Sequence, residues 1–206
     1  MLVLTLPMIS VTTTKSPGRS RDLRAMEAIF QATRELLLER GYPDLTIEGV
    51  AHRAKVGKST IYRWWPSKQS LVLDAAAKEL HFGDVPDTGN TRQDLISGID
   101  QLTRTFSNPV AGAVISAAIA HVERYPTLTR NFRNRWVTPW LQSFSAALER
   151  GIARGDLPRG LDVLFTGDLV LGLVFKRTLT HENPETEGLT AGLVDFLLNG
   201  RLPTRA

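Results

Sequence analysis

The segment LTIEGVAHRAKVGKSTIYRWWPSKQSL, residues 45–71, constrains the fold more than any other part of the chain. Thr46 is a favourable N-cap residue, and small apolar residues at helical spacing follow it. A turn at residues 55–57 precedes a second helix, which we expect from Lys58 to Trp64. Pro66 ends this helix, because the residue before a proline is disfavoured in the helical region. The segment therefore predicts two short helices joined by a tight turn.

The second short helix carries the mixture of side chains that DNA recognition requires. Ile61 and Trp65 lie four residues apart, so we expect both to face inward and anchor the helix. Cations, hydroxyl groups and aromatic rings cover the remaining surface, contributed by Lys58, Ser59, Thr60, Tyr62, Arg63 and Trp64. Cations and hydroxyl groups bind phosphates, and long side chains reach the edges of bases. Two helices around a tight turn, with the second as the reader, form a helix-turn-helix.

The letters GKST at residues 57–60 also match the end of a phosphate-binding P-loop. That motif requires a glycine at position 52, where this chain has His52, and it requires a preceding strand. The residues before the turn have the periodicity of a helix instead. Nucleotide binding is therefore a poor interpretation of this segment.

These residues resemble the DNA-binding domain of TetR-type (TetR/AcrR) transcriptional regulators. The shared pattern is Ala51-x-x-Ala54-x-Val56-x-x-x-Thr60-Ile61-Tyr62-x-x-Trp65-x-Ser67-Lys68-x-x-Leu71. The resemblance is close over residues 21 to about 80, and the rest of the chain agrees in helical layout. This chain departs from the usual family pattern in the turn, where Lys55 replaces a glycine and Gly57 replaces a serine cap. Trp64 and Trp65 also stand where the family has His and Phe.

The family resemblance, together with the polar and aromatic side chains expected on the surface of the second short helix, indicates candidate DNA contacts. We expect base contacts from Lys58, Ser59 and Tyr62. Phosphate contacts that fix the register are expected from Thr46, Lys55, Thr60, Arg63, Trp64 and Lys68. Lys68 lies in the first turn of the following helix, where a cation opposes the helix dipole. A phosphate partner would account for this position, and a solvated lysine is the alternative.

The chain divides into an arm and two domains. Residues 1–20, which include a Thr/Ser/Pro/Gly/Arg-rich run, are expected to form a flexible N-terminal arm. Residues 21–82 are expected to form the helix-turn-helix domain, with helices at 22–40 and 67–80 flanking the two short ones. The breaker cluster HFGDVPDTGN separates this unit from a helical effector-binding and dimerisation domain at 90–203. The fold class is therefore all-α.

Charge and composition agree with a DNA-binding protein. The 206 residues have a net charge of +4, and residues 1–80 carry all of it, with twelve Lys and Arg against eight Asp and Glu. This asymmetry fits an electrostatic footprint on DNA, although a solvated basic surface is also consistent with it. The absence of cysteine fits a reducing cytoplasm, where we expect the protein to act without contact to a membrane.

The last two helices are expected to form a homodimer interface. Residues 162–180 are apolar on nearly all sides, so one side requires cover from outside the core. Together with residues 187–198, this helix resembles half of a four-helix interface around a two-fold axis, as the family resemblance also implies. The expected interface residues are Phe165, Leu169, Gly172, Leu173, Leu189, Leu193, Phe196 and Leu197. A larger monomeric core is the alternative.

The second domain also contains candidates for a small-molecule site. Aromatic residues recur at four-residue spacing along residues 126–154, a helix that Pro139 should kink or split near Val137. We expect an apolar effector to contact Phe106, His121, Trp136, Trp140, Phe144, Phe175 and Arg177. Aromatic stripes at this spacing are also typical of plain core. The histidines are spread without metal-ligand spacing, so we expect no metal, no cofactor and no enzymatic activity.

The sequence thus predicts a DNA-binding transcriptional regulator, in the form of a ligand-responsive repressor that binds a palindromic operator in double-stranded DNA as a dimer. A non-specific nucleic-acid-binding protein and a transcriptional activator with the same fold are the alternatives.

Overall fold

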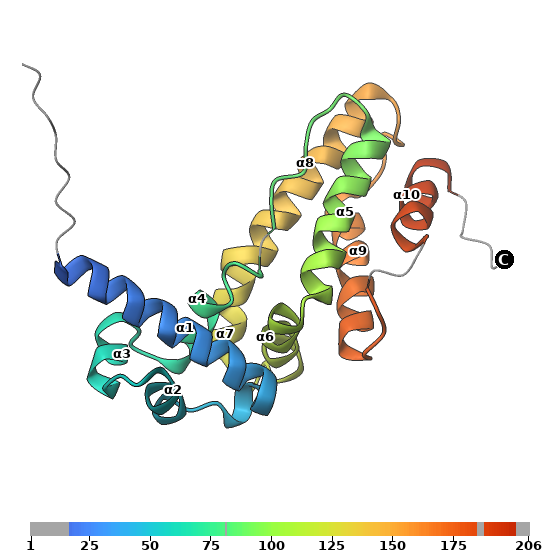
Figure 1. Cartoon of the computed structure of the whole chain (residues 1–206). Helices are drawn as coiled ribbons and strands as arrows, with labels where there is room; N and C mark the ends of the chain where they lie inside the picture. The colour runs from blue at the N-terminus through green and yellow to red at the C-terminus, as the bar shows by residue number, and fades with distance from the viewer. Residues whose placement is uncertain (1–16, 81, 185–187, 201–206) are drawn as a thin grey trace, which may run out of the picture.

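A computed structural model describes residues 17–80, 82–184 and 188–200, and these ranges contain helices and loops but no strand. Helices α1 to α4 form an N-terminal unit, and the remaining helices form an elongated bundle beside it (Figure 1). Helix α1 packs on α6, and α4 packs on α7, so the two units are in direct contact. The elements are α1 (Pro17–Asp44), α2 (Ile47–Ala54), α3 (Lys58–Trp64), α4 (Lys68–Ala75), α5 (Thr91–Ser107), α6 (Pro109–Ala120), α7 (Pro126–Phe132), η1 (Arg133–Val137), α8 (Thr138–Arg154), α9 (Val163–Leu179) and α10 (Leu189–Asn199).

Helix α1 begins earlier than the sequence suggests. Its first residue is Pro17, whose fixed backbone angle suits the first turn of a helix, so residues 17–20 are helical and do not belong to a flexible arm. Residues 1–16 and 201–203, which were assigned to the arm and to the end of the second domain, lie outside the described residues. At its other end the helix breaks at Gly41, which has a positive φ of 73° that favours glycine.

Helix α4 is shorter than expected. It starts after Ser67, whose side chain caps it as predicted, but it ends at Ala75 and not at Leu80. Arg34 on α1 donates a hydrogen bond of 3.2 Å to the carbonyl of Ala75, which a longer helix would use internally. The amide of Glu79 therefore binds the carbonyl of Ala76 in a turn.

The predicted interruption of the long helix near Val137 is confirmed. The chain runs through α7, a single π-helical turn at Arg133–Val137, and then α8. The amide of Thr138 binds the carbonyl of Arg133, five residues back, directly before Pro139. Proline has no amide hydrogen, so the wider turn absorbs the missing ladder bond.

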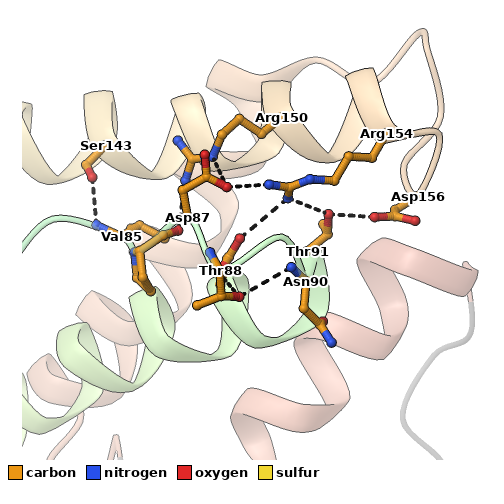
Figure 2. Close-up of polar contacts among 11 residues, drawn as sticks. Val85, Asp87, Thr88, Asn90, Thr91, Ser143, Arg150, Arg154 and Asp156 are labelled. Atoms are coloured by element: carbon orange, nitrogen blue, oxygen red, sulfur yellow. Dashed lines mark hydrogen bonds and ion pairs between the residues drawn. The ribbon is translucent and has the colours of Figure 1, made fainter.

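The loop between the two units is fixed on the helical bundle (Figure 2). The amide of Val85 donates to Ser143 Oγ on α8 at 2.8 Å, and Arg150 donates to the carbonyl of Pro86 at 2.9 Å. Asp87 forms ion pairs with both Arg150 and Arg154 of α8. These contacts hold the loop against α8.

Asp94 on α5 completes this attachment. Its Oδ1 accepts hydrogen bonds from the amide and hydroxyl of Thr88 at 3.0 and 2.7 Å, and Arg154 lies 3.5 Å from its Oδ2. Burial raises the pKa of Asp94, but the bonds from Thr88 and the charge of Arg154 outweigh it and hold the pKa below the ordinary 3.8.

Acid should therefore weaken the fold through Asp94. A carboxyl group with a lowered pKa contributes stability that is present above its unfolded-state pKa and lost as pH falls through the folded-state value. We expect the unfolding free energy to decrease below about pH 3.8 and Asp94→Asn to reduce that slope, measured by urea unfolding from pH 2.5 to 6. Asp84→Asn, at an exposed position of the same loop, is the control. Equal slopes in wild type and Asp94→Asn would contradict the assignment.

Candidate nucleic-acid interface

Helix α3 spans Lys58–Trp64, as predicted, and two buried residues anchor it. The side chain of Ile61 is fully buried, and Trp65 at the C-cap is 4% exposed. The ring of Trp65 packs against Phe30 of α1, with ring centres 5.2 Å apart, and its indole N–H donates to Asp74 of α4 at 3.0 Å. Apolar packing and one hydrogen bond thus fix the angle of α3 against two other helices.

The opposite face of α3 is exposed. Tyr62 is 50% exposed, Lys58, Ser59 and Arg63 are also exposed, and Thr60 and Trp64 are half-buried. Lys58 pairs with Glu48 at 3.1 Å and Arg63 with Asp22 at 3.3 Å, both at the surface. Exposed ion pairs stabilise proteins by about 1 kcal/mol or less, so a phosphate can replace these carboxylates at small cost. This face thus presents two cationic side chains that can exchange their carboxylate partners for phosphates, the hydroxyl group of Ser59 and the aromatic ring of Tyr62.

The turn before α3 has the geometry that the sequence suggested. Thr46 caps α2, because its Oγ1 accepts the amide of Gly49 at 3.1 Å. Lys55 has the left-handed backbone angles φ 55° and ψ 43°, and its side chain is exposed. A non-glycine residue in this conformation costs about 1 kcal/mol or more. Arg53 fixes α2 on α1 through two bonds to Glu39, at 2.6 and 2.7 Å.

Lys68 does not have the geometry of a phosphate contact. Its ammonium group donates to the carbonyls of Tyr42, Pro43 and Leu45 at 2.9, 3.3 and 3.0 Å, which accounts for its three protons. It also lies 4.4 Å from the centre of the Tyr42 ring. Burial lowers the pKa of Lys68, and the nearby charge of Arg124 lowers it further. Lys68 thus ties α4 to the connection between α1 and α2, and we remove it from the candidate DNA contacts.

This assignment separates stability from DNA affinity. We expect Lys68→Met to lower the unfolding free energy by about 1–3 kcal/mol, because it leaves three backbone carbonyls without their donor. The dependence of DNA affinity on salt concentration should keep its slope, since no phosphate contact is lost. Lys58→Met is the control, with a smaller slope and little change in stability. A reduced slope with unchanged stability in Lys68→Met would show a phosphate contact instead.

The predicted effector residues do not all line a cavity. Trp140 and Phe144 are buried and stacked, with ring centres 4.9 Å apart, and Trp136 is 7% exposed and packs on Phe132. These rings form core because their neighbours fill the space around them. Phe106 and His121 do line an open cavity of about 630 Å³ between the two units. Phe175 packs against Phe106, and Arg177 binds Glu182 and the carbonyl of Asn183 behind the cavity rim.

Helix α9 leaves an apolar face exposed in the single chain, as expected for a helix that requires cover on one side from outside the core. On α9, Phe165 and Leu169 are 61% and 50% exposed, and Gly172 is exposed as well. On α10, Phe196 is exposed. The remaining interface candidates are half-buried: Leu173, Leu189, Leu193 and Leu197. We name these exposed and half-buried apolar residues of α9 and α10 together the α9/α10 face.

Two negative findings apply to the described residues. They contain no group of three or more His, Cys, Asp or Glu side chains arranged to hold a metal ion. None of the helices in these ranges is both long and apolar enough to cross a membrane.

Comparison with known families shows where the chain belongs. Residues 29–79 match the model of the bacterial regulatory proteins of the tetR family. Residues 85–197, more than half of the chain, match the model of the tetracyclin repressor-like C-terminal domain. The chain belongs to the TetR family of transcriptional regulators.

Individual relatives of this TetR-family regulator are similar over nearly their whole length. It is 34% identical to the HTH-type transcriptional regulator YdeS of Bacillus subtilis over 193 residues. These residues are 92% of this chain and 96% of the relative. It is 30% identical over 173 residues to the DNA-binding transcriptional repressor TetR of Mycobacteroides abscessus, and the match covers 83% of this chain and 90% of the relative. The crystal structure of the TetR family transcription regulator SCO0332 has a TM-score of 0.62 and 29% identity, and covers 87% of this chain and 100% of that one.

The sequence did not reveal the residues that support α3 from behind. Asp74 binds the indole of Trp65 through one oxygen and forms an ion pair with Arg135 of η1 through the other. It therefore connects the C-cap of α3 to the bundle. A lone aspartate nine residues after a tryptophan has no local signature, so only the packing of α4 against α7 reveals it.

Proposed function

We propose that this TetR-family regulator is a ligand-responsive repressor that acts in the cytoplasm and binds a palindromic operator as a homodimer. Each subunit places α3 in the major groove of one half-site. Lys58, Ser59 and Tyr62 contact bases in this proposal. The phosphate contacts come from Thr46, Lys55, Thr60, Arg63 and Trp64.

The exposed face of α3 supports this proposal most directly. Ile61 and Trp65 fix the helix from behind, so the side chains on the other face are presented in one orientation. Lys58 and Arg63 form ion pairs with surface carboxylates, and the Arg63 guanidinium also lies over the ring of Trp64, 4.9 Å from its centre. DNA phosphates compete well with such exposed carboxylates at low salt. An exposed Tyr62 between two cations provides a long side chain with a hydroxyl group for a base edge.

The α9/α10 face supports the homodimer. Phe165 and Leu169 are 61% and 50% exposed in the single chain, so a dimer that buries the rest of each side chain gains roughly half of the 1.5–3 kcal/mol of full burial. A two-fold axis pairs each face with its own copy, and it sets two α3 helices on one side of the dimer. Such an arrangement reads inverted half-sites, which is the reason for proposing a palindrome.

Repression and ligand response follow from occupancy of the operator. A dimer bound at a promoter blocks transcription, and a ligand that prefers another spacing of the α3 helices shifts the population away from DNA. The similarity to a transcriptional repressor of Mycobacteroides abscessus supports repression and not activation. Activation requires an additional contact with the polymerase.

Selection of bound sequences from a random pool of DNA duplexes tests the proposal. We expect an inverted repeat, with affinity for it well above that for random duplex at moderate salt. Tyr62→Ala should weaken binding to the selected site by about 1–3 kcal/mol, while Val122→Ala, at an exposed position in the turn after α6, should not. A steep salt dependence without sequence preference would instead identify a non-specific nucleic-acid-binding protein.

A further inference from the structure

We infer that the effector site of this regulator is the cavity between its two units, and that it takes a neutral, mainly apolar small molecule. This inference rests on the proposed ligand response. The cavity of about 630 Å³ has the size of small-molecule sites in general. Its walls come from the end of α1, the end of α5, one side of α6 and the loop that follows α9.

The helical bundle is closely packed around Trp140. Trp140, the largest fully buried side chain, stacks on Phe144 and donates its indole N–H to the carbonyl of Gly98 at 3.3 Å. The missing β-carbon of Gly98 leaves room for Val85 of the interdomain loop, which lies 2.8 Å from the position a β-carbon would occupy. A ligand there would have to displace closely packed side chains.

The lining of the cavity favours a neutral, apolar ligand. The ring of Phe106, the small residues Gly112, Ala113 and Ala117 of α6, and Pro184 provide apolar surface. Among the described lining residues, Glu182 carries the acidic group, and it already pairs with Lys176 and with Arg177, the latter at 3.3 Å. Besides His121 and His181, the described lining contains no lysine or arginine, so a charged ligand would lose its hydration without gaining an unpaired lysine, arginine or carboxylate.

The position of the cavity connects a ligand to α3. Tyr42 and Pro43 of the wall are the residues whose carbonyls bind Lys68 of α4, and they lead directly into α2. On the other side, Tyr42 meets the edge of Tyr125, which meets His121 of the cavity rim, with ring centres 4.7 and 6.0 Å apart. Figure 1 shows the end of α1 crossing beside α6 at this junction. A ligand here touches both units, so its affinity depends on how they are placed relative to each other.

Two fluorescent probes test the site and the ligand class on the full chain. Prodan is a neutral naphthalene with a ketone oxygen, and 1-anilinonaphthalene-8-sulfonate is an anion of similar size. We expect Prodan to bind saturably, once per chain, and the sulfonate to bind about ten-fold more weakly or less. Saturating Prodan should also lower the affinity for the selected operator. Equal binding of the two probes would overturn the neutral class.

Variants locate the binding. Ser116→Phe should fill the cavity from α6 and weaken Prodan binding about ten-fold or more. Gly112→Leu is a second filling variant, because its β-carbon would meet no atom closer than 3.6 Å. Gln142→Phe, at an exposed position of α8, is the matched control and should bind Prodan as wild type does.

The outcomes separate this inference from the proposed function. Selective DNA binding together with unchanged Prodan affinity in both filling variants would overturn the site while the regulator assignment stands. Cavity binding of Prodan in a protein that selects no DNA sequence would overturn the proposed repressor instead.

Discussion

Leu169→Asp is expected to convert the protein into monomers and to lower its affinity for the selected operator by about 100-fold or more. Leu169 is half-exposed in the single chain and lies in the α9/α10 face, which the proposed dimer buries. The two-fold axis places two new carboxylates in one apolar interface, and an unpaired buried charge costs several kcal/mol. Each monomer then binds one half-site without the help of its partner. Analytical ultracentrifugation and fluorescence anisotropy measure the two effects.

The control keeps the charge but moves it away from the α9/α10 face. Thr138→Asp adds the same carboxylate at an exposed position at the start of α8 and should leave both dimerisation and operator binding unchanged. A dimer that persists in Leu169→Asp would show that the subunits associate elsewhere. A wild-type protein that sediments as a monomer would remove the basis for a palindromic site.

Ile61→Ala is expected to lower the free energy of unfolding by about 2–5 kcal/mol. Ile61 is fully buried and is the residue of α3 that reaches the core of the N-terminal unit, so its truncation leaves a cavity under a helix of two turns. The helix then loses its fixed angle, and we expect operator affinity to fall well beyond the effect of any single exposed residue of α3. Urea unfolding followed by circular dichroism measures the stability.

Ser59→Ala is the matched control on the same helix. Ser59 is exposed, and surface substitutions usually change stability by about 0.5 kcal/mol or less. Ser59→Ala should thus reduce operator binding without affecting the unfolding midpoint. A stability loss below about 1 kcal/mol in Ile61→Ala would mean that α3 is not anchored through this side chain.

The sequence alone determined the local structure of the DNA-binding unit. The bounds of α3 and the cap at Thr46 follow from signals within a few residues of each position. Pro139 likewise indicated where the long helix is interrupted, because a missing amide hydrogen has a local consequence. The inward orientation of Ile61 and Trp65 followed from helical periodicity alone.

Only the tertiary structure decided which partner each polar or aromatic group has. The sequence made Lys68 a candidate phosphate contact. In the folded chain its ammonium group instead binds the carbonyls of Tyr42, Pro43 and Leu45, which lie more than twenty residues earlier. Trp140 and Phe144 were effector candidates by spacing, but packing made them core and placed the cavity elsewhere. Caps and turns arise from neighbouring residues in the chain, whereas hydrogen-bond partners and cavities depend on segments that meet only after folding.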